Sequence, residues 1–82
     1  MDIRWNPVKS ERLKKTRGVS FEEILEAKLV DVVRHPRRMH QDVLVYECKG
    51  YLWAVPTVFE NGVLFLKTLY PSRKLMKRYH RR

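Results

Sequence analysis

The sequence predicts an α+β fold: two N-terminal helices, then an antiparallel meander of three or four strands, then a short C-terminal helix. Capping signals and helix-forming residues dominate residues 9–29 and return after residue 72. The region between them consists of β-branched and aromatic runs separated by turn dipeptides. Because a chain of 82 residues supplies one hydrophobic core, residues 1–82 are expected to form a single domain.

Two helices are expected before the strands. Asn6-Pro7 suits the turn that leads into a helix over residues 9–17, and Gly18 can adopt the left-handed conformation that ends many helices. Ser20 stands three residues before Glu23, which is the capping-box spacing, so a second helix is expected to begin there.

Strand signals occupy residues 29–66. A short strand is expected over residues 29–33, followed by strands near residues 43–46 and 51–55 and another that starts at residue 63. Lys49-Gly50 is expected to join the middle pair. Asn61-Gly62 is the strongest hairpin signal, because a type I′ turn needs two residues that tolerate positive φ. Pro56 has no amide donor, so its strand is expected to be bulged or to lose a partner there.

Two-residue turns at both hairpins define a register that sorts the strand side chains into two faces. We expect the helices to cover the face that carries Val45 and Ala54. On the other face, Tyr46, Trp53 and Tyr70 are expected to form a cross-strand row that is partly exposed to water.

The C-terminal quarter of the chain is basic. After a strand at its start, Ser72 is expected to cap a last helix over residues 73 to about 80. Residues 63–82 contain seven Lys or Arg residues and no Asp or Glu, and the whole chain has a formal charge of +9. Cations held on a folded core favour a polyanionic partner such as RNA. The expected RNA contacts are Arg37, Arg38, Trp53, Lys74, Lys77 and Arg78, and Arg81 and Arg82 are expected to contact phosphate or an acidic partner.

Composition argues against several functional classes. Cys48 is the only cysteine, which excludes an intrachain disulfide and a cysteine-rich zinc site and favours a reducing compartment. The three histidines are scattered, so no metal and no cofactor are expected. The apolar runs are too short to span a bilayer and the N-terminus lacks a signal region, so a cytoplasmic location without membrane contact is expected.

Metal-free cleavage of RNA is compatible with the remaining residues. The ribose 2′-hydroxyl can act as the nucleophile if the protein supplies a base, a cation for the charged phosphorane and an acid for the leaving 5′ oxygen. We expect Lys67 or His40 to act as the base, Arg73 to stabilise the transition state, and Tyr70 to donate a proton or position the phosphate.

Each of these four residues also has a purely structural interpretation. Lys67 can extend from a sheet edge into solvent, and Tyr70 can be a core aromatic residue with an exposed hydroxyl. Arg73 can begin a solvated helix, and His40 can be a solvated loop residue.

The order of motifs resembles the BrnT family of toxins from type II toxin-antitoxin systems. The resemblance covers nearly the whole chain, and its most specific element is Gly-Val-Ser-Phe-Glu-Glu at residues 18–23. The remaining matches are Ile3-Arg4-Trp5-Asn6-Pro7-Val8-Lys9 and Tyr70-Pro71-Ser72-Arg73-Lys74. The loop at residues 35–41 departs from the acidic loop that is common in this family.

This resemblance implies a RelE-like ribonuclease fold with two helices before the sheet. It implies a toxin that cleaves RNA and inhibits translation, with Arg73 as the matching functional residue. It also implies a neutralising antitoxin whose ribbon-helix-helix part binds DNA. Two alternatives remain open from the residues: a non-catalytic module that binds nucleic acid or a protein partner, and a ribosome-associated structural protein.

Overall fold

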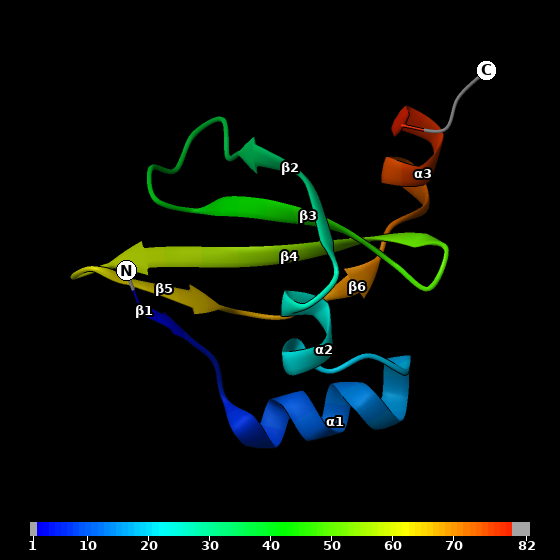
Figure 1. The fold of residues 1–82 in the computed structure, drawn as a ribbon. Coiled ribbons are helices and arrows are strands. Elements are labelled where there is room, and N and C mark those ends of the chain that lie inside the picture. Colours follow the sequence, from blue (N-terminus) through cyan, green and yellow to red (C-terminus); the bar gives the residue numbers. More distant parts are fainter. Residues whose placement is uncertain (1, 80–82) are drawn as a thin grey trace.

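Residues 2–79 form three helices and a mixed sheet of six strands (Figure 1). The computed structural model describes residues 2–79. The elements follow one another as β1 (Asp2–Arg4), α1 (Pro7–Arg17), α2 (Phe21–Leu25), β2 (Lys28–Arg34), β3 (Asp42–Cys48), β4 (Tyr51–Glu60), β5 (Val63–Leu66), β6 (Tyr70–Pro71) and α3 (Arg73–Tyr79). The α+β class is therefore confirmed.

The expectation of two helices followed by an antiparallel sheet is wrong in two respects. β1 precedes α1 and pairs in parallel with β5, so the sheet has the order β1-β5-β4-β3-β2 and is mixed. β6 is a third partner of β4, in addition to β3 and β5. β1 and β6 have three and two residues, which are too few to show an alternating pattern, and their pairing depends on residues far away in the sequence.

The predicted helix ends are confirmed. The Asn6 side chain accepts hydrogen bonds from the first amides of α1, and Gly18 ends this helix with φ 85°. Ser20 and Glu23 form the reciprocal capping box at the start of α2. None of the helices within residues 2–79 is long and apolar enough to cross a membrane.

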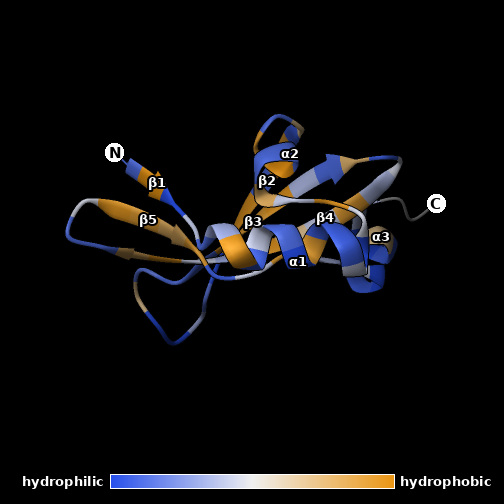
Figure 2. Cartoon of the chain, turned by 90° about the horizontal axis from the view of Figure 1, so that it is seen from below, coloured by the Kyte–Doolittle hydropathy of each residue, from blue (hydrophilic) through white to orange (hydrophobic). Residues whose placement is uncertain are grey.

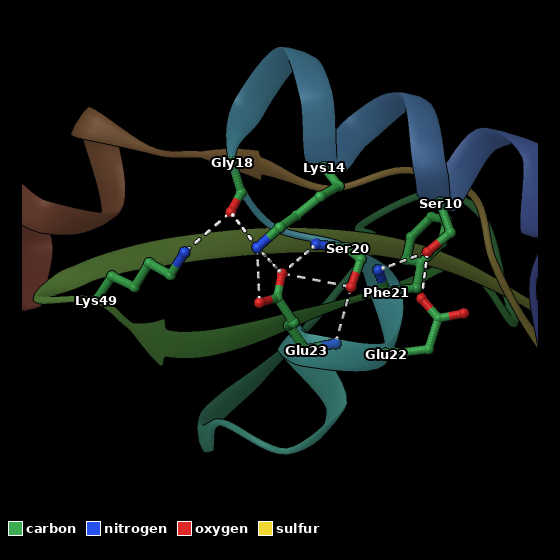
Figure 3. Close-up of polar contacts among 8 residues, drawn as sticks. All are labelled: Ser10, Lys14, Gly18, Ser20, Phe21, Glu22, Glu23 and Lys49. Atoms are coloured by element: carbon green, nitrogen blue, oxygen red, sulfur yellow. Dashed lines mark hydrogen bonds and ion pairs between the residues drawn. The ribbon is translucent and has the colours of Figure 1, made fainter.

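A polar network joins α1 to α2 (Figure 3). The buried Ser10 hydroxyl donates to the Glu22 carboxylate and accepts from the Phe21 amide at 3.0 Å. This donation is the largest of the causes that lower the pKa of Glu22. Beside it, the Lys14 ammonium lies 2.8 Å from a Glu23 carboxylate oxygen and lowers the pKa of Glu23. The Gly-Val-Ser-Phe-Glu-Glu element therefore holds the two helices together.

Both predicted hairpins are confirmed. Lys49 and Asn61 have φ values of 55° and 54°, and the glycine after each also has a positive φ. These are the signs that a type I′ turn requires. The resulting pairs, such as Tyr46 with Trp53 and Phe59 with Leu64, follow the register expected from two-residue turns.

The prediction of which sheet face the helices cover is wrong. Leu13 of α1 and Phe21 of α2 pack into one core cluster with Tyr46, Trp53 and Val55. The face that carries the aromatic row is thus the covered face, and Trp53 is only 6% exposed. Figure 2 shows α1 in front of the sheet, with most of its residues hydrophilic. Only Ser10 and Leu13 of this helix are buried.

A second, smaller apolar layer lies on the opposite face, beneath α3. Val45, Leu52 and Ala54 are buried there. The Tyr79 hydroxyl of α3 donates to the carboxylate of Asp31, which pairs with Val45 across the sheet. Helices consequently pack against both faces.

Candidate functional site

Two basic surfaces project from opposite faces of the sheet. The first, which we call the C-terminal basic surface, consists of exposed side chains that follow β5 and continue along α3: Lys67, Tyr70, Arg73, Lys74, Lys77 and Arg78. The second, which we call the loop pocket, lies where the β2–β3 loop meets the start of β3, the end of β4 and the start of β5. Its lining consists of Arg34, His35, Pro36, Arg37, Arg38, Met39, His40, Asp42, Leu44, Thr57, Phe59 and Leu64.

A shift of one residue between β5 and β6 decides where the tyrosine of the first surface lies. Thr57 pairs with Leu66 on β5, and continuing this register would place Leu69 opposite Ala54. Ala54 instead pairs with Tyr70. Leu69 therefore turns into the core below α1 and α2, and Tyr70 lies on the other face with 40% of its surface exposed.

This shift corrects the expected aromatic row, because Tyr70 does not lie beside Tyr46 and Trp53. The carbonyl of Leu69, which belongs to the residue displaced by the shift, accepts a hydrogen bond from the Arg17 guanidinium at 2.5 Å. An α1 side chain thereby satisfies a backbone group that the irregular pairing leaves free.

Lys67 and Tyr70 project from the same face of the sheet. Lys67 follows the buried Leu66, so its side chain points away from α1 and α2, and its amide donates to the Pro56 carbonyl at 2.9 Å. Arg73 begins α3 directly after Ser72, whose hydroxyl accepts from the Leu75 amide and caps the helix as predicted. Tyr70 and Arg73 thus lie in regular structure, in β6 and α3, whereas Lys67 lies between β5 and β6 and is attached to β4 by its backbone hydrogen bond.

Contacts at both ends attach α3 to the sheet. Near its start, the Ser72 amide donates to the Leu52 carbonyl at 2.9 Å, and the Leu52 amide donates to the Met76 sulfur at 3.3 Å. At its end, the Tyr79 hydroxyl donates to Asp31. This bond is the largest cause that lowers the pKa of Asp31 and raises the pKa of Tyr79. The cations of α3 are therefore presented at a defined position.

The loop pocket has a volume of about 570 Å³. Leu44, Phe59 and Leu64 form its apolar floor on the same sheet face as Trp53, at the end that α1 and α2 do not cover. Three arginines and two histidines surround this floor, and Asp42 is the one carboxylate in the lining. A cationic pocket with an aromatic floor can bind a base and a phosphate together.

The main chain and ring contacts define the shape of the loop. The His35 Nδ1 atom accepts hydrogen bonds from the amides of Arg37 and Arg38 at 3.1 Å, so the proton of a neutral ring lies on Nε2. His40 has a φ of 65°, and its carbonyl accepts from the Phe59 amide at 2.8 Å. The ring centroids of His40 and Phe59 are 6.2 Å apart.

The structure divides the four expected catalytic residues between the two surfaces. Lys67, Tyr70 and Arg73 belong to the C-terminal basic surface, whereas His40 lines the loop pocket on the other face. Among residues 2–79, no hydrogen bond or ion pair joins His40 to the other three side chains. His40 is separated because its carbonyl pairs with the Phe59 amide near the end of β4, whereas Tyr70 pairs with Ala54 nearer the start of this strand.

The expected RNA contacts are divided in the same way. Arg37 and Arg38 line the loop pocket, and Lys74, Lys77 and Arg78 are exposed on α3. Arg81 and Arg82 lie outside the described residues. Trp53 is the exception: it is buried, and its indole N–H donates to the Cys48 carbonyl at 3.1 Å, so it presents no stacking surface.

Sequence reasoning missed most of the loop pocket, including Arg34, His35, Asp42 and Phe59. A signal for two of them was present in the register. The alternation that places Leu44 and Trp53 on one face also places Asp42 and Phe59 there. The positions of the three arginines could not be read from the two hairpin registers, because Arg34 is placed by the pairing of β2 with β3, and Arg37 and Arg38 by the path of the β2–β3 loop.

No group of three or more His, Cys, Asp or Glu side chains within residues 2–79 is arranged to hold a metal ion. Comparison with protein-family models, curated proteins and solved structures finds no match for this chain. The two basic surfaces are therefore the structural features that bear on function.

Proposed function

We propose that this protein is the toxin of a type II toxin-antitoxin system, a metal-independent ribonuclease that cleaves RNA and inhibits translation. The observation that carries the proposal is the C-terminal basic surface, where Lys67 and Tyr70 share one sheet face and Arg73 follows at the start of α3. Residues 63–79 contain no carboxylate to neutralise these groups. The BrnT resemblance supports the toxin class.

The residue types on this surface match the three requirements of cleavage by the ribose 2′-hydroxyl. Lys67 accepts the 2′ proton when its side chain is the neutral amine, Arg73 stabilises the charge of the phosphorane, and Tyr70 donates a proton to the leaving 5′ oxygen. Lys74, Lys77 and Arg78 extend along α3 and hold neighbouring phosphates. A cognate ribbon-helix-helix antitoxin neutralises the toxin. The toxin meets its RNA substrate either free in solution or at the ribosome.

Induced expression with RNA analysis tests this proposal. Wild-type protein should arrest growth and produce RNA fragments that end in 2′,3′-cyclic phosphate, because the 2′ oxygen is the nucleophile. Arg73→Ala should lower the cleavage rate about 100-fold, which is the typical effect of removing one group that stabilises transition-state charge. Arg12→Ala, which removes an exposed arginine from α1, should leave the rate unchanged.

Normal growth with abundant folded wild-type protein would refute the toxin assignment. Equal loss of cleavage in the Arg12 and Arg73 variants would refute the assigned site, because it would indicate a dependence on total charge alone.

A second candidate function is a non-catalytic RNA-binding module. The location of His40 in the loop pocket, apart from Lys67, Tyr70 and Arg73, favours this alternative because it leaves no histidine among residues 2–79 beside the proposed catalytic residues. This module would bind RNA in a salt-sensitive way without producing cyclic phosphate ends.

A further inference from the structure

The loop pocket differs chemically from the C-terminal basic surface. It combines cations with an apolar floor and one carboxylate, whereas the C-terminal basic surface has cations and a phenol only. Phosphate binding by itself requires neither an aromatic floor nor a carboxylate. These two features indicate what kind of nucleotide the pocket selects.

The floor of the pocket suits a base that is not stacked in a duplex. Phe59 is 37% exposed, and the His40 ring stands beside it at a tilt of 41°. Stacking on an aromatic side chain typically contributes about 1–3 kcal/mol per base and requires an unpaired nucleotide. The volume of about 570 Å³ falls in the range of small-molecule pockets and accommodates one nucleotide.

The position of Asp42 is set by backbone pairing. It lies opposite Arg34 at the start of β3, and its carbonyl accepts from the buried Thr57 hydroxyl at 2.8 Å. Alternation along β3 places its side chain on the same face as Leu44, which belongs to the pocket floor.

The carboxylate of Asp42 is available to a ligand. Within residues 2–79 it takes part in no hydrogen bond or ion pair, although three arginines line the same pocket. An ionised carboxylate is an acceptor only, so it selects a base that presents N–H donors. The Watson–Crick edge of guanine presents two adjacent donors, N1–H and N2–H, whereas uracil presents one N–H between two carbonyl acceptors.

We propose that the loop pocket binds an unpaired guanine of single-stranded RNA. Phe59 stacks on the base, Asp42 accepts hydrogen bonds from guanine N1–H and N2–H, and Arg34, Arg37 and Arg38 contact the adjoining phosphates. This proposal rests on the proposed function in one respect, namely that the chain acts on RNA, and it adds the base that the protein selects.

Binding of short oligonucleotides tests the proposal without variants. The probes are 2′-O-methyl octamers, which lack the nucleophile and stay intact: eight uracils, or seven uracils with one central guanine, inosine or adenine. The guanine octamer should bind at least tenfold more tightly than the uracil octamer. Inosine lacks the N2 amino group but keeps N1–H, so its octamer should lose about tenfold relative to guanine, as expected for one hydrogen bond to a charged acceptor.

Two variants with the same charge change locate the selecting group. Asp42→Asn should reduce the preference for guanine over uracil to less than threefold, while its affinity for the uracil octamer should be at least that of the wild type. Glu60→Gln alters an exposed carboxylate on β4 outside the pocket lining, and it should retain the preference. Thermal unfolding of both variants verifies that they fold.

The outcomes separate this inference from the proposed function. Equal binding of all four octamers, or an unchanged preference in Asp42→Asn, would overturn the guanine assignment and leave RNA binding intact. Absence of binding to every octamer would overturn both. Tight binding of a decaglutamate peptide together with weak binding of all octamers would identify the pocket as a protein interface and would also overturn the proposal.

Discussion

Replacement of Arg34, Arg37 and Arg38 by Gln tests whether the loop pocket holds phosphates. All three side chains are exposed and line the same pocket, so the substitutions remove charge without removing core packing. Each phosphate contact with a single strand contributes roughly 0.7 to the slope of log K against log salt, so three contacts contribute about 2. When salt rises from about 50 to 200 mM, the ratio of the wild-type affinity for RNA to that of the triple variant should therefore fall roughly 15- to 20-fold.

Fluorescence anisotropy of a labelled single-stranded RNA at four salt concentrations measures this slope for each protein. The matched control replaces Lys9, Arg12 and Lys15 of α1 by Gln, which removes the same charge outside the loop pocket. Its slope should stay close to that of the wild type. An equal decrease in both triple variants would mean that only total charge matters, and an unchanged slope in the pocket variant would refute the phosphate contacts.

Three further predictions concern the scaffold that positions these surfaces. Ser10→Ala removes the acceptor of the buried Phe21 amide, so chemical denaturation should show a loss of about 1–3 kcal/mol in the free energy of unfolding. Thr16→Ala, at an exposed position of the same helix, should change this free energy by less than about 0.5 kcal/mol. Equal losses would contradict the α1–α2 network. Tyr79→Phe removes the bond that lowers the pKa of Asp31 and raises that of Tyr79, so the wild type should have a higher Tm than the variant between about pH 4 and 10. This advantage should be lost as the carboxylate is protonated below this window or the phenol ionises above it. A constant difference in Tm from pH 3 to 8 would argue against the bond. Trp53→Phe should cost on the order of 1–3 kcal/mol in stability and leave the Kd for RNA unchanged, because the side chain is buried, and a weaker Kd in folded protein would restore Trp53 as an RNA contact.

The features that short-range rules govern were predicted from the sequence. Gly18, the Ser20 capping box and the two hairpin turns depend on backbone conformations and hydrogen bonds within a few residues. The pairing of β3 with β4 and of β4 with β5 follows from those turns, since a two-residue loop fixes which residues lie opposite each other.

The candidate site was predicted only in part. Charge in the sequence pointed to Lys67, Arg73 and the cations of α3, which are exposed as a polyanion site requires. Phe59 and Asp42 were missed, because their role depends on a loop that returns across the end of the sheet. His40 was grouped with residues from the other face for the same reason.

The sequence by itself determined the α+β class, the helix caps, the hairpin registers and the net positive charge. Tertiary structure alone decided which face the helices cover, because both faces carry apolar residues and alternation cannot distinguish them. It also decided that β1 pairs in parallel with β5 and that Tyr70 turns away from Trp53, since both results come from contacts between distant segments. These long-range contacts divide the basic residues into two surfaces on opposite faces of one sheet.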